Sequence, residues 1–130
     1  MEIYVGGSSQ GKLDYVLDKS NISRELVIEG SDLDIHIDKK DLSMVRIINN
    51  FHLFIKKYAN MSDDIYKFME RLYVENENVI IICSQVGGGV VPVDASEREW
   101  RELVGRVMCS AMKRAVHAER IICGMGQVLK

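Results

Sequence analysis

Hydrophobic positions along the chain follow two spacings, which predict strands separated by helices. Apolar or alternating runs predict strands over 1–5, 25–29, 78–84 and 120–123, and an antiparallel edge strand over 127–130. Apolar residues three and four apart predict helices over 11–18, over 44–58, after Ser62 and after Ser96. This order predicts an α/β fold of three layers, a mostly parallel sheet with helices on both faces. Ser62 is a predicted N-cap, and Ser96 with Glu99 fits a capping box.

The segment 33–38, L-D-I-H-I-D, alternates apolar and polar residues. Its polar side chains, Asp34, His36 and Asp38, form either a metal site or the wet face of an exposed strand. The exposed strand is the preferred interpretation. It either pairs with 25–29 as a hairpin, or 25–29 is a single strand that ends at the acidic residue Glu29.

The first strand runs into a glycine loop with the features of a phosphate-binding loop. Residues 5–13 read V-G-G-S-S-Q-G-K-L. A loop between a strand and a helix cradles phosphate with backbone N–H groups, while a lysine reaches the terminal phosphates. The predicted nucleotide-binding residues are Gly6, Gly7, Ser8, Ser9, Gln10, Gly11, Lys12 and Leu13. Gly6 and Gly11 are expected to supply backbone angles that a Cβ would forbid. A serine or threonine hydroxyl at the position of Leu13 ordinarily ligates Mg²⁺, and Leu13 has none. The chain can therefore keep nucleotide binding while phosphoryl transfer is weakened.

Composition narrows the classes of protein further. The 130 residues fit one domain, 1–130, and the net charge of −2 argues against nucleic acid as a partner. No apolar run is long enough to span a bilayer, and the N-terminus does not resemble a signal peptide, so the cytoplasm is the expected compartment. Cys83, Cys109 and Cys123 are predicted to be buried reduced thiols.

The second half of the chain resembles a known enzyme family. The stretch C-S-Q-V-G-G-G-V-V-P, the following R-E-W-R-E-L-V-G-R-V and the ending C-G-M-G-Q-V-L-K are similar to adenosylcobinamide kinase/adenosylcobinamide-phosphate guanylyltransferase. The resemblance implies a P-loop kinase fold, GTP or ATP with Mg²⁺, a cobinamide-type corrinoid substrate and a homo-oligomer. It implies catalytic roles for Lys12 and, on the Mg²⁺ side, Glu29. The residues expected to line the site are Ser84, Gln85, Gly87, Gly88, Gly89, Arg98 and Arg101.

The chain departs from the family at several chemical positions. The family's histidine that becomes guanylylated lies between the first helix and the acidic strand, and residues 14–24 contain no histidine. Ser84-Gln85 replaces an Asn-Glu pair, and Leu13 replaces a serine. Three hypotheses follow: an enzyme with at most the kinase half-reaction, a non-catalytic nucleotide-binding or regulatory relative, or a structural remnant. Arg98 and Arg101 either receive phosphate or pair with Glu97 and Glu102 along the helix.

Overall fold

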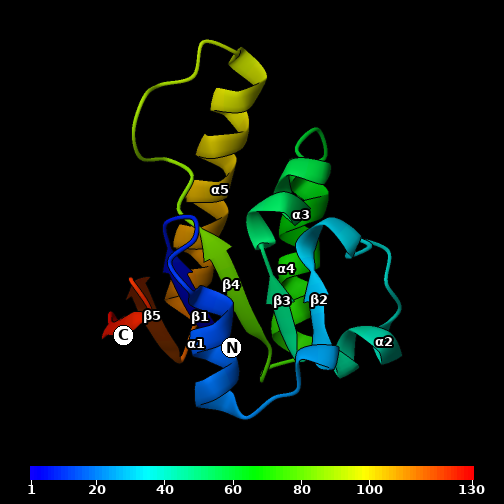
Figure 1. Ribbon diagram of the computed structural model, residues 1–130. Helices are drawn as coiled ribbons and strands as arrows, with labels where there is room; N and C mark the ends of the chain where they lie inside the picture. Colours follow the sequence, from blue (N-terminus) through cyan, green and yellow to red (C-terminus); the bar gives the residue numbers. More distant parts are fainter.

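The computed structural model describes residues 1–130, which form a single six-stranded sheet with helices on both faces (Figure 1). The strands are β1 Glu2–Gly6, β2 Val27–Glu29, β3 Ile47–Asn49, β4 Ile80–Ser84, β5 His117–Ile122 and β6 Met125–Val128. The α-helices are α1 Lys12–Ser20, α2 Lys39–Met44, α3 Phe51–Lys57, α4 Ser62–Glu75 and α5 Ala95–Arg114. Two short 3₁₀ turns, Arg24–Leu26 and Gly30–Asp32, flank β2.

The strand order is β2-β3-β4-β1-β5-β6, and every pair except β5–β6 is parallel. This confirms the predicted α/β class and the antiparallel strand at the C-terminal edge. Helix α1 covers one face over a small cluster of six buried residues that includes Tyr4 and Val16. The other face carries α3, α4 and α5 over a core of 25 buried residues. The main core therefore lies on the side opposite α1.

The predicted helix over 44–58 is wrong, because this stretch contains three elements. Helix α2 ends at Met44, β3 occupies Ile47–Asn49, and α3 begins at Phe51. Ile47 and Ile48 are fully buried between neighbouring strands rather than on a helix face. Asn50 turns the chain between β3 and α3 with a left-handed backbone, φ 53°. Such a backbone ends regular structure, and asparagine is one of the few side chains that adopts it readily.

The predicted hairpin between 25–29 and 33–38 is also wrong. Strand β2 pairs in parallel with β3, and residues 33–38 form turns rather than a strand. Leu33 and Ile35 are nonetheless buried, so the alternation marked the buried side correctly. The Asp34 carboxylate accepts the His36 backbone N–H, and Asp38 caps α2 by accepting from the Asp41 N–H at 2.8 Å. These polar residues stabilise turns.

Two predicted caps and two predicted buried thiols differ from the structure. Met61 precedes α4 without a side-chain cap, and Asp94 caps α5 by accepting the Ser96 and Glu97 N–H groups. Of the cysteines only Cys83 is buried, whereas Cys109 lies on the outer face of α5 and Cys123 lies in the β5–β6 turn. None of the helices has the length and apolar character to cross a membrane.

A buried carboxylate on β5 ties α1 to the sheet. Glu119 on β5 is 2% exposed and accepts hydrogen bonds from Tyr15 at 2.8 Å, from Lys19, and from His117 at 3.0 Å when that ring is the donor. Burial alone would raise the pKa of Glu119, but the hydrogen bonds from Lys19, His117 and Tyr15 outweigh it and lower the pKa to about 2.

This cluster predicts an acid-sensitive contribution to stability. Because the folded pKa lies below the ordinary 4.5, the contribution is present above about pH 4.5 and is lost as pH falls toward about 2. Glu119→Gln should cost about 2–3 kcal/mol at neutral pH. The exposed, unpaired Glu99→Gln should change stability by less than about 0.5 kcal/mol. Urea unfolding between pH 2 and 7 checks this, and equal acid sensitivity in Glu119→Gln and the wild type would contradict it.

Candidate functional site

The carboxyl ends of the parallel strands meet at one edge of the sheet, where the loop after β1 lies (Figure 1). Gly6 at the end of β1 lies opposite Ser84 at the end of β4, and the Gln85 N–H donates to the Gly6 carbonyl at 2.9 Å. Ligands of open α/β sheets gather at this edge. The predicted site residues Ser84 and Gln85 therefore lie directly beside the phosphate-loop candidate.

Lys12 is buried in this loop without a counter-ion. Lys12 is only 7% exposed, and its Nζ donates a hydrogen bond to the Gly7 carbonyl at 2.7 Å. No salt bridge in the structure includes Lys12. Burial lowers the pKa of the ammonium, since a charge removed from water is destabilised. Buried lysines are ordinarily paired, so this one leaves room for an anion.

The loop is fastened to the β5–β6 turn through Gln10. The Cys123 N–H donates to Gln10 Oε1, and the Gly124 N–H donates to the Gln10 carbonyl, each at 2.8 Å. Ser9 and Gly11 adopt left-handed backbone angles, as a glycine at position 11 was predicted to allow. Gly6 is required for a different reason than predicted: a Cβ there would lie 2.4 Å from the Ile121 carbonyl oxygen.

A hollow of about 280 Å³ opens beside the loop. The residues that line it are Ser9, Gln10, Gly11, Lys12, Leu13, Asp14, Arg24, Asn49 and Asn50. Four of these, Asp14, Arg24, Asn49 and Asn50, were not predicted. The signal for the asparagines was their position directly after Ile47-Ile48, which the helical interpretation concealed. Asp14 and Arg24 pair with each other at 2.6 Å on the exposed rim.

Glu29 lies farther from the loop than its predicted catalytic role suggests. Strands β3 and β4 separate β2 from β1, which corresponds to about 14 Å at ordinary strand spacing. The Glu29 carboxylate accepts hydrogen bonds from Asn49 Nδ2 at 2.8 Å and Asn50 Nδ2 at 2.9 Å. Its place in a metal shell stays a prediction, but its observed partners are two amides.

His52 is the histidine that the fold brings to this edge. It follows Asn50 in the first turn of α3, and its Nδ1 accepts the Ser84 N–H at 3.3 Å. Burial, together with the charges of Lys12 and Lys56, lowers the pKa of His52. The ring is therefore held neutral beside the end of β4.

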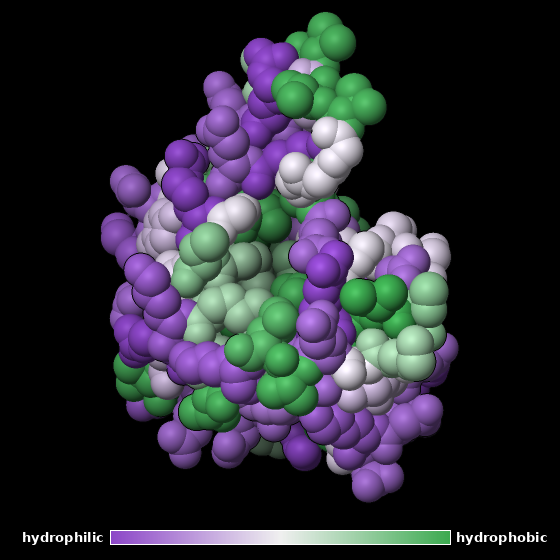
Figure 2. Space-filling view, turned by 90° about the vertical axis from the view of Figure 1, so that its left-hand side faces the viewer, coloured by the Kyte–Doolittle hydropathy of each residue, from purple (hydrophilic) through white to green (hydrophobic).

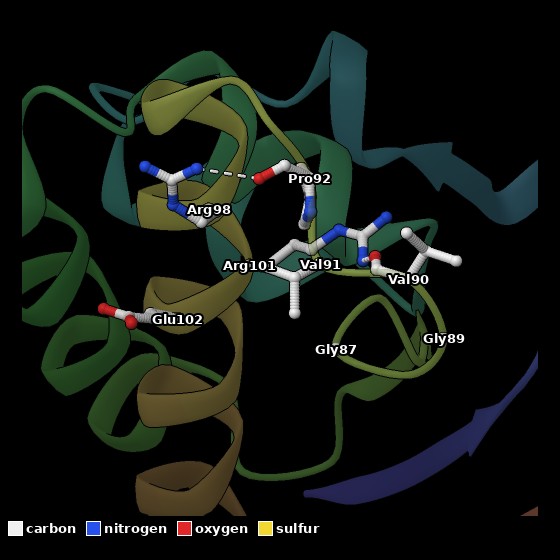
Figure 3. A pocket seen from close by; sticks show the side chains of 8 residues that line it. All are labelled: Gly87, Gly89, Val90, Val91, Pro92, Arg98, Arg101 and Glu102. Atoms are coloured by element: carbon white, nitrogen blue, oxygen red, sulfur yellow. Dashed lines mark hydrogen bonds between the residues drawn. The ribbon is translucent and has the colours of Figure 1, made fainter.

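The remaining predicted residues belong to a separate arm formed by the loop after β4 and the start of α5. Gly87, Gly89, Arg98 and Arg101 line a cavity of about 240 Å³ within it (Figure 3), and Gly88 lies in the same loop. Arg98 donates to the Pro92 and Val93 carbonyls at 2.8 Å, and Arg101 donates to the Val90 carbonyl at 3.2 Å. Both guanidinium groups thus brace the loop, while phosphate binding by them stays a prediction.

The arm ends in exposed apolar side chains. Val90 and Val93 are 88% and 96% exposed, and hydrophobic residues gather at the tip of the molecule in Figure 2. Glu102 points away from the loop in Figure 3 and has no ion-pair partner, so the predicted pairing of the arginines with Glu102 is not formed. Glu97 lies 4.0 Å from Arg101 Nε and 3.8 Å from Lys56 Nζ, at the outer limit of an ion pair.

A family model described as cobinamide kinase / cobinamide phosphate guanyltransferase matches residues 27–129, more than three quarters of the chain. The chain belongs to this family. A search of curated proteins found no match. The matched residues include β3, β4, the arm and the β5–β6 turn, and they begin after the glycine loop. The match therefore does not test the glycine loop, whose assignment as a phosphate-binding loop stays a prediction from residues 5–13 and their geometry.

One departure from the family's loop has a structural explanation. Leu13 lies in the first turn of α1 and packs against the small cluster beneath that helix. The side chain therefore serves the packing of α1 against the sheet, and this position offers no oxygen ligand. The structure has no cluster of three or more His, Cys, Asp or Glu side chains suited to a metal ion. A cation in the hollow would depend on amide oxygens and on phosphate.

The contact of Gly6 predicts that this glycine is needed for folding as well as for any ligand. Gly6→Ala should destabilise the protein by about 2 kcal/mol or more, because the Ile121 carbonyl is fixed in β5. Gly105→Ala should instead stabilise it by about 0.5–1 kcal/mol, since its Cβ meets open space on α5. Chemical denaturation of both variants checks this, and equal effects would show that the β1–β5 contact imposes no limit.

Proposed function

We propose that the chain binds GTP or ATP with Mg²⁺ at residues 6–13 and performs at most the kinase half-reaction of its family. The observation that carries the proposal is Lys12, a buried ammonium with a single backbone partner and no carboxylate. A triphosphate would supply the missing negative charge. The loop N–H groups and the N-terminus of α1 favour the same ligand.

The acceptor in this proposal is a cobinamide-type corrinoid. The hydroxyl of its aminopropanol arm would attack the γ-phosphorus, the bond to the β-phosphate oxygen would break, and the hydroxyl proton would leave to solvent. The nucleoside diphosphate would depart from the loop. Lys12 would stabilise charge on the β- and γ-oxygens, and a divalent cation would neutralise the rest. Guanylyl transfer is left out of the proposal, because residues 14–24, where the family's acceptor histidine is expected, contain no histidine.

A second candidate is a non-catalytic nucleotide-binding or regulatory relative. The observation in its favour is Leu13, which is committed to packing and leaves α1 without a hydroxyl ligand. Such a protein would bind nucleotide through the loop with little dependence on Mg²⁺. Metal dependence therefore separates the two candidates.

Titration calorimetry with GTP and ATP, each with and without Mg²⁺, tests the proposal. Lys12→Ala should weaken nucleotide binding about 10- to 100-fold, the value of one charged hydrogen-bond donor. The control Lys67→Ala removes an exposed lysine from α4 and should bind as the wild type does. Absence of binding at millimolar nucleotide would overturn both candidates. If Mg²⁺ strengthens binding, phosphorylation of cobinamide is the next assay.

A further inference from the structure

Glu29 fixes the orientation of two amides at the edge of the hollow. Each of its carboxylate oxygens accepts one hydrogen bond, Oε1 from Asn49 Nδ2 and Oε2 from Asn50 Nδ2. An ionised carboxylate can only accept, so both asparagines must present their NH₂ groups to it. The carboxylate therefore fixes which end of each amide faces Glu29 and leaves the two Oδ1 atoms on the other side.

The two amide oxygens are left without protein partners. Neither Asn49 Oδ1 nor Asn50 Oδ1 takes part in a hydrogen bond, and neither is sealed from solvent. Asn49 is only 8% exposed, yet it lines the same hollow as the phosphate loop. The amide oxygen of a residue as buried as Asn49 ordinarily has a protein or water partner. Asn49 and Asn50 thus line the hollow and each carries an amide oxygen that has no protein partner.

The same hollow is lined by hydrogen-bond donors, namely the backbone N–H groups of the loop and the Lys12 ammonium. The loop and Lys12 suit phosphate oxygens, which are acceptors as well. Amide and phosphate oxygens repel each other unless a cation joins them. Asn49 ends β3, and a single strand separates β3 from β1, which places the amides about 10 Å from the first strand. Hard divalent cations take oxygen ligands of this kind together with phosphate and water.

We propose that Asn49 and Asn50 supply amide-oxygen ligands to the divalent cation of a bound nucleoside triphosphate, with Glu29 as the positioning residue behind them. This inference rests on the proposed function. The amides replace the hydroxyl that Leu13 lacks, and they come from a different element of the fold. Because both ligands are neutral, the phosphates supply the charge that retains the cation. Asp14 and Arg24 also line the hollow but neutralise each other at its rim.

The test compares GTP affinity with and without Mg²⁺ in wild type and variants, by calorimetry. Asn49→Ala and Asn50→Gly should reduce the gain from Mg²⁺ about tenfold or more, while metal-free GTP binding changes by less than about twofold. Glycine suits position 50, where φ is 53°. Glu29→Gln should also reduce the gain, because an NH₂ donor replaces one carboxylate oxygen and the asparagine facing it can then turn its amide oxygen toward that donor.

Asn21→Gly is the matched control, since Asn21 has a left-handed backbone, φ 57°, at the far end of α1. It should keep the full gain from Mg²⁺. A gain from Mg²⁺ that survives in Asn49→Ala and Asn50→Gly would overturn the inference and leave the proposed function intact. Wild-type binding that does not depend on Mg²⁺ would also overturn the inference, and it would favour the non-catalytic candidate over the kinase half-reaction. Wild-type protein that binds no nucleotide at all would overturn both, and thermal unfolding confirms that each variant is folded.

Discussion

The parallel pairing of β1 with a strand on either side is the constraint on which the site depends. Gly6 lies opposite Ser84 of β4, and Val5 lies opposite Arg120 of β5. Parallel strands share one direction, so the loops after all of them emerge at one edge. The loop after β1 has no freedom to lie elsewhere. The absence of a side chain at Gly6 is a consequence, since the backbone of β5 passes within contact distance.

The carboxyl edge of the sheet carries few charged side chains that are free of a charged or amide partner. Lys12 has no acidic partner, the exposed Asp14 and Arg24 cancel, and the Glu29 carboxylate is occupied by two amides. The loop side is therefore positive, while the β3 side offers neutral oxygens. One lysine is too little to balance a triphosphate, which carries several negative charges. On our proposal a cation supplies the balance, and the neutral amides hold it only while phosphate is present.

Local features of the fold were predictable, and features that depend on distant pairing were not. The glycine loop and the strands over 1–5 and 78–84 follow from short runs in the sequence. Strand β3 has only three residues, and its stability comes from pairing with β2 and β4. Apolar residues from α2, β3 and α3 together match helical spacing, so periodicity alone joined three elements into one. The left-handed turn at Asn50 separates them, and an Asn-Asn pair was its local signal.

That single error also concealed Asn49 and Asn50, the two residues to which our proposal assigns the cation. Within a helix, Asn49 and Asn50 would be two ordinary polar residues. At the end of β3 they lie at the carboxyl edge of the sheet, where open α/β folds bind their ligands. The same correction changes the meaning of Glu29. Its carboxylate is one strand beyond the amides, where it cannot lie beside the loop but can hold the amides in place. The loss of a hydroxyl at Leu13 then does not imply the loss of a metal, because ligands to one ion need not come from one segment. On our proposal the cation requires only a suitable geometry of oxygen atoms, and the Glu29 carboxylate provides it by orienting the two amides.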